Sequence, residues 1–261
     1  MLIRARERLV VEAGEHDSWE LVNRTQKQRP SSGWLIPQPA HSALSGELAA
    51  ALSPEHFPGL SEPVRRCIAL HDTGWSPFDA QQIADVRERA DTQPVSFVAE
   101  KPDVFLKAWT QSIDTVERIC PEGGYMVSRH FDSLGQEPES SQSKSDCKKI
   151  EAFHAQEHAR QSRLEVASGK SHDELEALLQ ANRFCDLLSL FFCANVELRD
   201  GAAAVFMQRA EAAEPYRITQ NTQGWSFGEH TPFRERAELS FSGVSFGAAA
   251  KGGAWFHVAV R

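Results

Sequence analysis

The chain has 261 residues, of which 41% are hydrophobic, so it is long enough to form one large domain around an apolar core. Its 36 acidic residues outnumber its 28 basic residues, and the net charge of −8 argues against a nucleic-acid-binding surface, which needs excess positive charge. The longest apolar run, near residues 187–196, is too short to span a bilayer, and no basic amphipathic stretch indicates binding to a membrane surface.

The first 25 residues are predicted to form a β-hairpin, in which residues 8–12 and 18–22 are the strands and residues 14–17 the turn. Residues 1–8 are charged and lack the apolar stretch of a secretion signal. The five cysteines show no paired spacing, which fits free thiols in a reducing compartment. We therefore expect a cytoplasmic protein.

The middle of the chain has helical periodicity. A Ser-x-x-Glu capping box at residues 171–174 opens the last and most apolar of the helices. Three prolines in residues 76–102 predict an irregular segment, either a lid that carries Trp75, Phe78 and Phe97 or a packed surface loop. Residues 135–144 have few apolar side chains and are predicted to be mobile. The predicted helices span residues 40–52, 61–74, 103–119, 125–134, 148–166 and 171–193.

The last fifty residues alternate apolar and polar side chains with a period of two, which predicts strands at residues 217–219, 225–227, 237–246 and 254–260. The expected fold class is mainly α with a small antiparallel sheet (α+β). We expect a single domain over residues 1–261, with a helical core at about 35–210 and terminal β segments at 1–25 and 214–261.

Polar side chains interrupt the buried faces of three predicted helices. His41 lies on the stripe of Leu44 and Leu48, and His71 is on the stripe of Ile68, with Asp72 at its edge. Asp186 interrupts the most apolar helix. A lone inward histidine is usually a hydrogen-bonded core residue, and a lone aspartate often pairs with an arginine.

For Asp186 that arginine is Arg183, one turn earlier in the chain. The coincidence of all four residues favours a divalent metal site formed by His41, His71, Asp72 and Asp186. Its mixed nitrogen and oxygen ligands suit Fe, Mn, Zn, Ni or Mg.

The order of a histidine, a His-Asp pair and a distant aspartate resembles the HD superfamily of metal-dependent phosphohydrolases. The motifs are most similar to the bacterial family DUF3891. The matching stretches are Ala40–Gly46, Leu70–Trp75, Val127–Phe131 and Asp186–Leu190. The resemblance implies an HD-like helical bundle in which His41, His71, Asp72 and Asp186 bind the metal. Histidines that hold a second metal in other HD proteins are missing between Asp72 and His130.

The resemblance therefore predicts a metal-dependent phosphohydrolase that acts on a small phosphorylated molecule, with nucleotides among the candidates. Asp72 would orient or deprotonate the attacking water, and Arg129 and His130 would stabilise charge in the transition state. One alternative is an HD-type di-iron oxygenase, which needs six protein ligands. The other is an HD-like ligand-binding or interaction protein without catalytic activity.

His154 and His158 lie four residues apart on a predicted helix, a spacing that suits binding of one cation. Their neighbours are mostly charged or polar, so the sequence favours a solvated helix face at this position.

Overall fold

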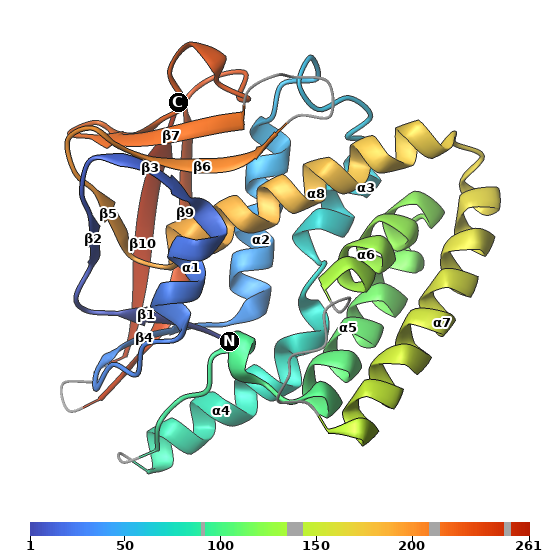
Figure 1. Ribbon diagram of the computed structural model, residues 1–261, viewed down its shortest axis with the longest axis horizontal. Helices are drawn as coiled ribbons and strands as arrows, with labels where there is room; N and C mark the ends of the chain where they lie inside the picture. Colours follow the sequence, from blue (N-terminus) through green and yellow to red (C-terminus); the bar gives the residue numbers. More distant parts are fainter. Residues whose placement is uncertain (90–91, 135–142, 209–214, 248–251) are drawn as a thin grey trace.

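The computed structural model of the protein describes residues 1–89, 92–134, 143–208, 215–247 and 252–261. A central pair of helices, α2 (Gln38–Ala51) and α8 (His172–Cys193), lies between a β-sheet and a group of outer helices formed by residues 62–69, 102–117, 121–134 and 144–168 (Figure 1). The polar residues singled out in the sequence lie on this pair and on the outer helices that face it.

Five of the six predicted helices are confirmed to within four residues at each end, but the helix predicted at 61–74 ends at Ala69, before His71 and Asp72. Ser171 and Glu174 form the predicted capping box of α8. Two of the outer helices, α5 (Pro102–Glu117) and α7 (Lys144–Ser168), are joined by hydrogen bonds. Arg160 and Arg163 of α7 each donate a hydrogen bond of 2.7 Å to Glu117 of α5. The segment 135–144, predicted to be mobile, lies outside the described residues except for its last two positions. The outer helices are α3 (Glu62–Ala69), α5 (Pro102–Glu117), α6 (Pro121–Leu134) and α7 (Lys144–Ser168).

The prediction of a small antiparallel sheet is wrong. Among the described residues, eight strands form one mixed sheet in the order β1-β4-β9-β10-β8-β7-β6-β3, and β2 and β5 form a separate parallel pair. Within the large sheet, β10 pairs in parallel with β8, and β3 with β6. The strands are β1 (Leu2–Ala5), β2 (Leu9–Val11), β3 (Gly14–Asp17), β4 (Gly33–Ile36), β5 (Val196–Leu198), β6 (Ala202–Gln208), β7 (Pro215–Asn221), β8 (Gly224–Ser226), β9 (Ala237–Phe246) and β10 (Gly253–Val260).

The predicted N-terminal hairpin is also wrong. Residues 18–22, expected to be a strand, belong to helix α1 (Ser18–Gln26), because the Asp17 side chain accepts a 2.8 Å hydrogen bond from the Glu20 N–H and caps the first turn. Strands β2 and β3 pair with β5 and β6 rather than with each other. The N-terminal segment is therefore held in place by strands that follow α8 in the sequence.

The segment 76–102 is more regular than expected. Helix α4 (Ser76–Glu88) occupies its first half, because Pro77 falls in the first turn, where its missing N–H needs no acceptor. Trp75 is 2% exposed and lies inside the core, which favours the packed segment over the lid.

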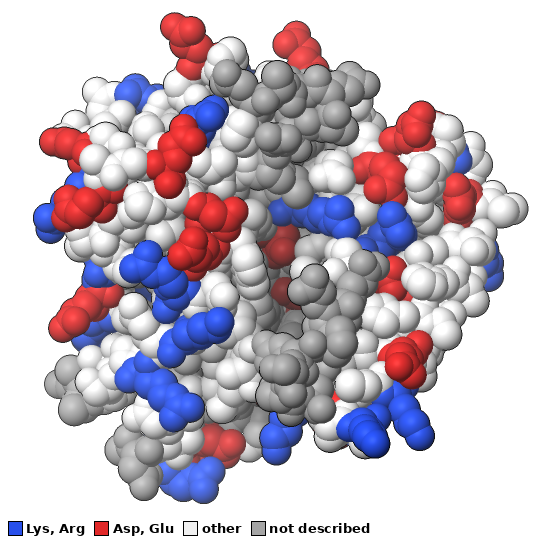
Figure 2. Space-filling view, in the orientation of Figure 1, with Lys and Arg blue, Asp and Glu red and all other residues white. Residues whose placement is uncertain are grey.

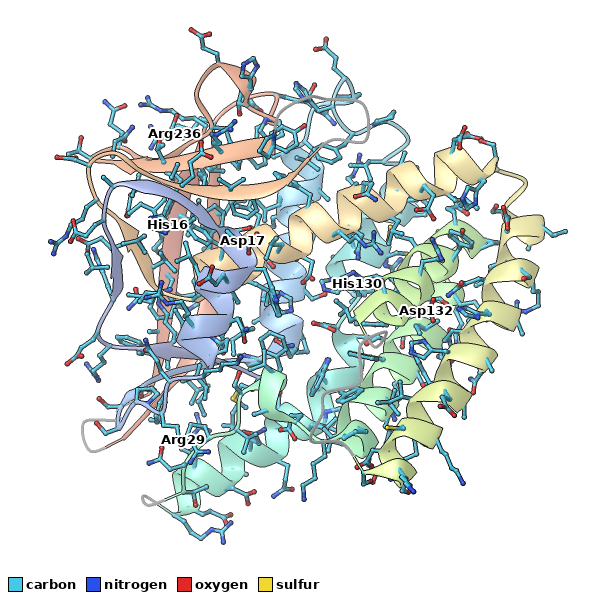
Figure 3. All side chains as sticks on the ribbon, in the orientation of Figure 1. His16, Asp17, Arg29, His130, Asp132 and Arg236 are labelled. Carbon is cyan, nitrogen blue, oxygen red and sulfur yellow. The ribbon has the colours of Figure 1, made fainter. Side chains whose placement is uncertain are left out.

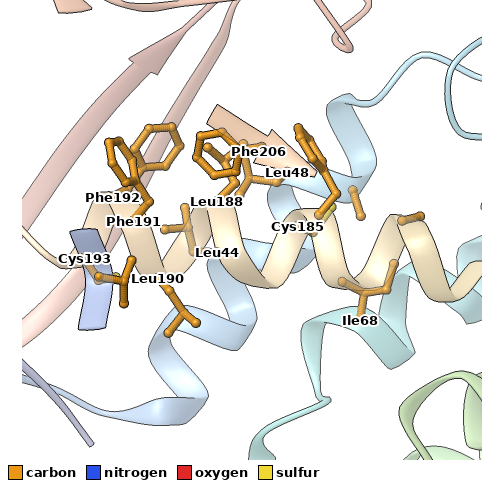
Figure 4. Packing of buried hydrophobic residues seen from close by; sticks show 14 of the residues in the cluster. Leu44, Leu48, Ile68, Cys185, Leu188, Leu190, Phe191, Phe192, Cys193 and Phe206 are labelled. Carbon is orange, nitrogen blue, oxygen red and sulfur yellow. The ribbon is translucent and has the colours of Figure 1, made fainter. Parts of the chain in front are cut away.

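The apolar core surrounds α8. Figure 4 shows Leu44 and Leu48 of α2 and Ile68 of α3 packed about the side chains of α8, with Phe206 of β6 on the sheet side. Phe184 of α8 is fully buried, with its ring centroid 5.1 Å from that of Phe57. Within the described ranges, no helix combines the length and apolar character that a membrane span requires.

Candidate metal centre

Three chain segments bring four potential metal ligands together. His41 comes from α2, His71 and Asp72 from the turn after α3, and Asp186 from α8. One ligand atom from each of these residues lies within 4.8 Å of the others. The convergence expected from the sequence is therefore present in the fold.

A close approach of two helices positions the histidines. Gly46 of α2 packs directly against Ala69 of α3, and a Cβ atom at Gly46 would lie 2.4 Å from the Ala69 Cβ. Ordinary carbon–carbon contacts are about 3.5–4.0 Å, so only glycine fits at this point. His41 lies five residues before Gly46, and His71 lies two residues after Ala69, so this contact constrains how far apart the two histidines lie.

The shortest distances within the cluster join imidazole nitrogens to carboxylate oxygens. His41 Nε2 lies 2.8 Å from Asp72 Oδ2, and His71 Nε2 lies 3.1 Å from Asp186 Oδ1. His71 Nε2 is also 3.7 Å from Asp72 Oδ2. Both histidines are fully buried, whereas the Asp186 side chain is 13% exposed, so access from solvent is on the Asp186 side.

Hydrogen bonds outside the cluster orient both imidazoles. The Ser189 hydroxyl donates to the Asp186 carbonyl oxygen, so it accepts from His41 Nδ1–H at 2.9 Å. His71 Nδ1–H donates to the Ile68 carbonyl oxygen at 2.7 Å. Each imidazole thus directs Nε2 towards the carboxylates, as metal-binding histidines do when their other nitrogen is engaged.

The charges of the cluster are strongly coupled. Burial by itself would lower the pKa of His71, but the carboxylates of Asp72 and Asp186 outweigh burial and raise it to about 9. Burial would raise the pKa of Asp186, yet the imidazoles of His130 and His71 hold it well below its usual range. The site thus stabilises positive charge between two carboxylates.

Two buried polar atoms next to this charge have no hydrogen-bond partner, namely Asp72 Oδ1 and His130 Nδ1. A buried polar atom without a partner is costly, and a cation with its bound water would satisfy such atoms. Figure 2 shows acidic side chains at the bottom of a hollow near the centre of this face, with basic side chains on part of its rim. The donor set and the orphaned atoms therefore fit a divalent metal.

The other residues singled out from the sequence lie at the edge of the cluster or bind partners outside it. His130, labelled in Figure 3, comes from α6, and its Nε2 lies 3.4 Å from Asp186 Oδ2 at the edge of the cluster. Arg129 instead binds Glu176 of α8, with a guanidinium nitrogen 3.0 Å from the carboxylate. The ion pair between Arg183 and Asp186 that the sequence allowed does not occur among the described residues, since the partners of Asp186 are histidines.

His154 and His158 lie away from the cluster. Both contact Asp132 of α6, a residue that the sequence did not single out. Ser189 was also missed as the partner of His41, although its position one turn after Asp186 placed it on the same helix face. No local signal links Asp132 to the two histidines, because the contact depends on how α6 packs against α7.

A separate surface hollow of about 810 Å³ lies over α5 and α7 and is lined by Glu117, Arg160 and Arg163 among others. Arg160 and Arg163 pair with Glu117, and Arg160 also pairs with Asp114, so most of its charges are already balanced. The buried cluster is the better candidate for chemistry.

Comparison with known proteins gives one match. A family model described as a protein of unknown function, DUF3891, matches residues 22–242. The matched range includes all four residues of the cluster and His130. The searches of curated proteins and of solved structures found no match.

Proposed function

The chain belongs to the DUF3891 family, and we propose that it is a metal-dependent phosphohydrolase of the HD type that acts on a phosphate ester. The observation that carries this proposal is the meeting of His41, His71, Asp72 and Asp186, whose ligand atoms lie within 4.8 Å of one another. Their order along the chain, one histidine, a His-Asp pair and a distant aspartate, is that of the HD superfamily.

Two imidazole nitrogens and two carboxylates form a ligand set suited to Fe, Mn, Zn, Ni or Mg. A divalent cation held there lowers the pKa of a water molecule and polarises a phosphoryl oxygen. The two carboxylates balance the cation's charge, which leaves the net charge of the centre close to neutral and favours entry of an anionic substrate.

The chain's own groups have distinct roles in the proposed reaction. Asp72 Oδ1, which has no protein partner, accepts a hydrogen bond from the attacking water and orients it. His130, beside Asp186, donates a proton to the oxygen of the leaving group. Arg129 binds Glu176 and would have to release that carboxylate before it could contact the phosphate.

The number of ligands favours one metal over a di-iron centre. The cluster offers four residues, with His130 as a fifth at its edge. The di-iron alternative needs six, and the histidines that would complete it, His154 and His158, contact Asp132 instead. Oxygenase chemistry is therefore the less supported proposal.

Elemental analysis of protein purified without chelator, combined with hydrolysis of p-nitrophenyl phosphate and a panel of nucleotides, tests the proposal. We expect bound transition metal and turnover in the wild type, and Asp186→Asn should lower the metal content by about one equivalent per chain and abolish turnover. Asp173→Asn, an exposed aspartate in the first turn of the same helix, is the matched control and should change neither.

If Asp186→Asn keeps both the bound metal and the turnover of the wild type, the proposal is refuted. Metal bound without turnover on the whole panel would instead support the non-catalytic alternative. Two coupled irons per chain would support the oxygenase.

A further inference from the structure

A second group of potential metal ligands lies between α6 and α7. Asp132 of α6 is 1% exposed, and two histidines of α7 contact its carboxylate. His154 Nδ1 lies 2.6 Å from Asp132 Oδ1, and His158 Nε2 lies 3.2 Å from Asp132 Oδ2. Figure 3 shows Asp132 on the side of α6 that faces α7.

This group is separate from the cluster around Asp186. His130 and Asp132 are two positions apart on α6, and residues at that spacing point to nearly opposite sides of a helix. His130 contacts Asp186 of α8, whereas Asp132 contacts α7. The two groups therefore lie on either side of α6 and share no residue.

The two histidines have the spacing and the access that a metal requires. Residues four apart lie on the same helix face, one turn from each other, and two histidines at this spacing bind zinc in many helices. The His154 side chain is 19% exposed and that of His158 is 61% exposed, so a cation reaches them directly from solvent. The buried carboxylate supplies the negative charge.

We propose that Asp132, His154 and His158 form a second cation site that binds Zn²⁺, with water as the fourth ligand. The ring centroids of the two histidines are 6.4 Å apart, and their nitrogens bind different oxygens of the carboxylate. Tetrahedral coordination requires them to converge on one point. His158 is exposed enough to turn its ring towards that point. His154 Nδ1 lies at hydrogen-bond distance from Asp132 Oδ1, 2.6 Å, so it has to draw back from the carboxylate before both atoms can bind one ion.

The site is structural rather than hydrolytic. The sequence from His154 to His158 has the His-x-x-Glu-His pattern, in which the glutamate of some zinc peptidases acts as a general base. Here Glu157 accepts a 2.8 Å hydrogen bond from Ser128, and Arg160 Nε lies 3.1 Å from the same oxygen. Only Oε2 has these partners, and Oε1 is buried without one. Because the whole side chain is closed off from solvent, the carboxylate is not available to activate water.

A zinc ion at this position joins α6 to α7. Since α6 also carries His130, the ion would hold the helix that supplies the edge of the first metal centre. Its role is to fix the position of α6, and its loss should loosen the α6–α7 pair without removing any ligand of the first centre.

Isothermal titration of chelator-treated protein with ZnCl₂ tests this site. We expect Asp186→Asn, which disables the first centre, to bind one equivalent of Zn²⁺, and Asp186→Asn/His158→Ala to bind none. His172→Ala is the matched control, because His172 is also 61% exposed and its charged partner among the described residues is Glu165, away from Asp132. It should leave the stoichiometry unchanged.

The proposal is overturned if Asp186→Asn binds no zinc, or if adding His158→Ala leaves its stoichiometry and affinity unchanged. Should Asp186→Asn fail to fold, the comparison moves to the wild-type background. There, His158→Ala must lose one equivalent relative to both wild type and His172→Ala, and retention of all equivalents refutes the site. Both results are independent of whether the first centre is a phosphohydrolase.

Discussion

Replacement of Gly46 by alanine tests whether the close contact of α2 and α3 positions the metal ligands. The new Cβ would lie 2.4 Å from the Ala69 Cβ and 2.9 Å from its Cα. Ordinary contacts are about 3.5–4.0 Å, so the helices must separate by roughly 1 Å. Metal–ligand distances tolerate only about 0.2 Å, so the displacement is several times larger than the site can absorb.

Two energetic effects oppose each other in Gly46→Ala. Overpacking costs about 1–3 kcal/mol, whereas alanine in place of glycine inside a helix stabilises by about 0.5–1 kcal/mol. We expect the metal-free variant to be less stable by about 1–2 kcal/mol in urea unfolding, and its affinity for the metal to fall at least tenfold in titration calorimetry.

Gly46→Ala/Ala69→Gly provides the control, because it moves the methyl group from one helix to the other and restores the space between them. The double variant should recover metal affinity relative to the single variant, which a double-mutant cycle measures directly. If Gly46→Ala binds metal as tightly as wild type and is equally stable or more stable, the helix contact does not set the ligand geometry.

Three further results are expected. Ser189→Ala removes the acceptor that orients His41 and should weaken metal binding about 10–100-fold in calorimetry. Because it leaves the buried His41 Nδ1–H without a partner, it should also lower the free energy of unfolding by about 1–3 kcal/mol. Burial opposes ionisation of Glu117, but its two arginine partners, Arg160 and Arg163, outweigh burial and lower its pKa from the usual 4.5. The ionised carboxylate therefore stabilises the fold above that pH, and this stabilisation is lost as the pH falls. Glu117→Gln should therefore flatten the decline in urea stability from about pH 5 to about pH 3, and an unchanged decline would contradict the assignment. Phe184→Ala, in the core between α8 and the sheet, should lower the unfolding free energy by about 3–5 kcal/mol, whereas a loss below about 1 kcal/mol would show that the site collapses around the missing ring.

The helices were predictable because their signals are local. The capping box at Ser171 and Glu174 and the spacing of apolar side chains both act within a few turns of the chain. The same spacing directed His41, His71 and Asp186 inward, so their meeting could be expected once the helices were assumed to pack together. What the sequence could not supply was the distance between them, which depends on Gly46 lying against Ala69.

The sheet was mispredicted because its pairing is not local. Residues 18–22 alternate like a strand, but the cap from Asp17 starts a helix there. Strand β4 has only four residues and was not predicted, and the alanine-rich strand β6 lacks a strong strand signal. The contact of Asp132 with His154 and His158 was missed for the same reason, since it arises only when α6 packs against α7.

The pairing of the first strands with β5 and β6 has a consequence for how the protein folds. Gly14 lies opposite Ala202, and Leu9 opposite Val196, so each strand pairs with a partner on the far side of all the helices from α2 to α8 in the chain. During synthesis these N-terminal strands must wait, without partners, until the ribosome has released the polypeptide beyond α8, while the helices between them form from short-range contacts. Closure of the sheet should therefore be the slow step of refolding, and the waiting strands should be the point at which aggregation begins.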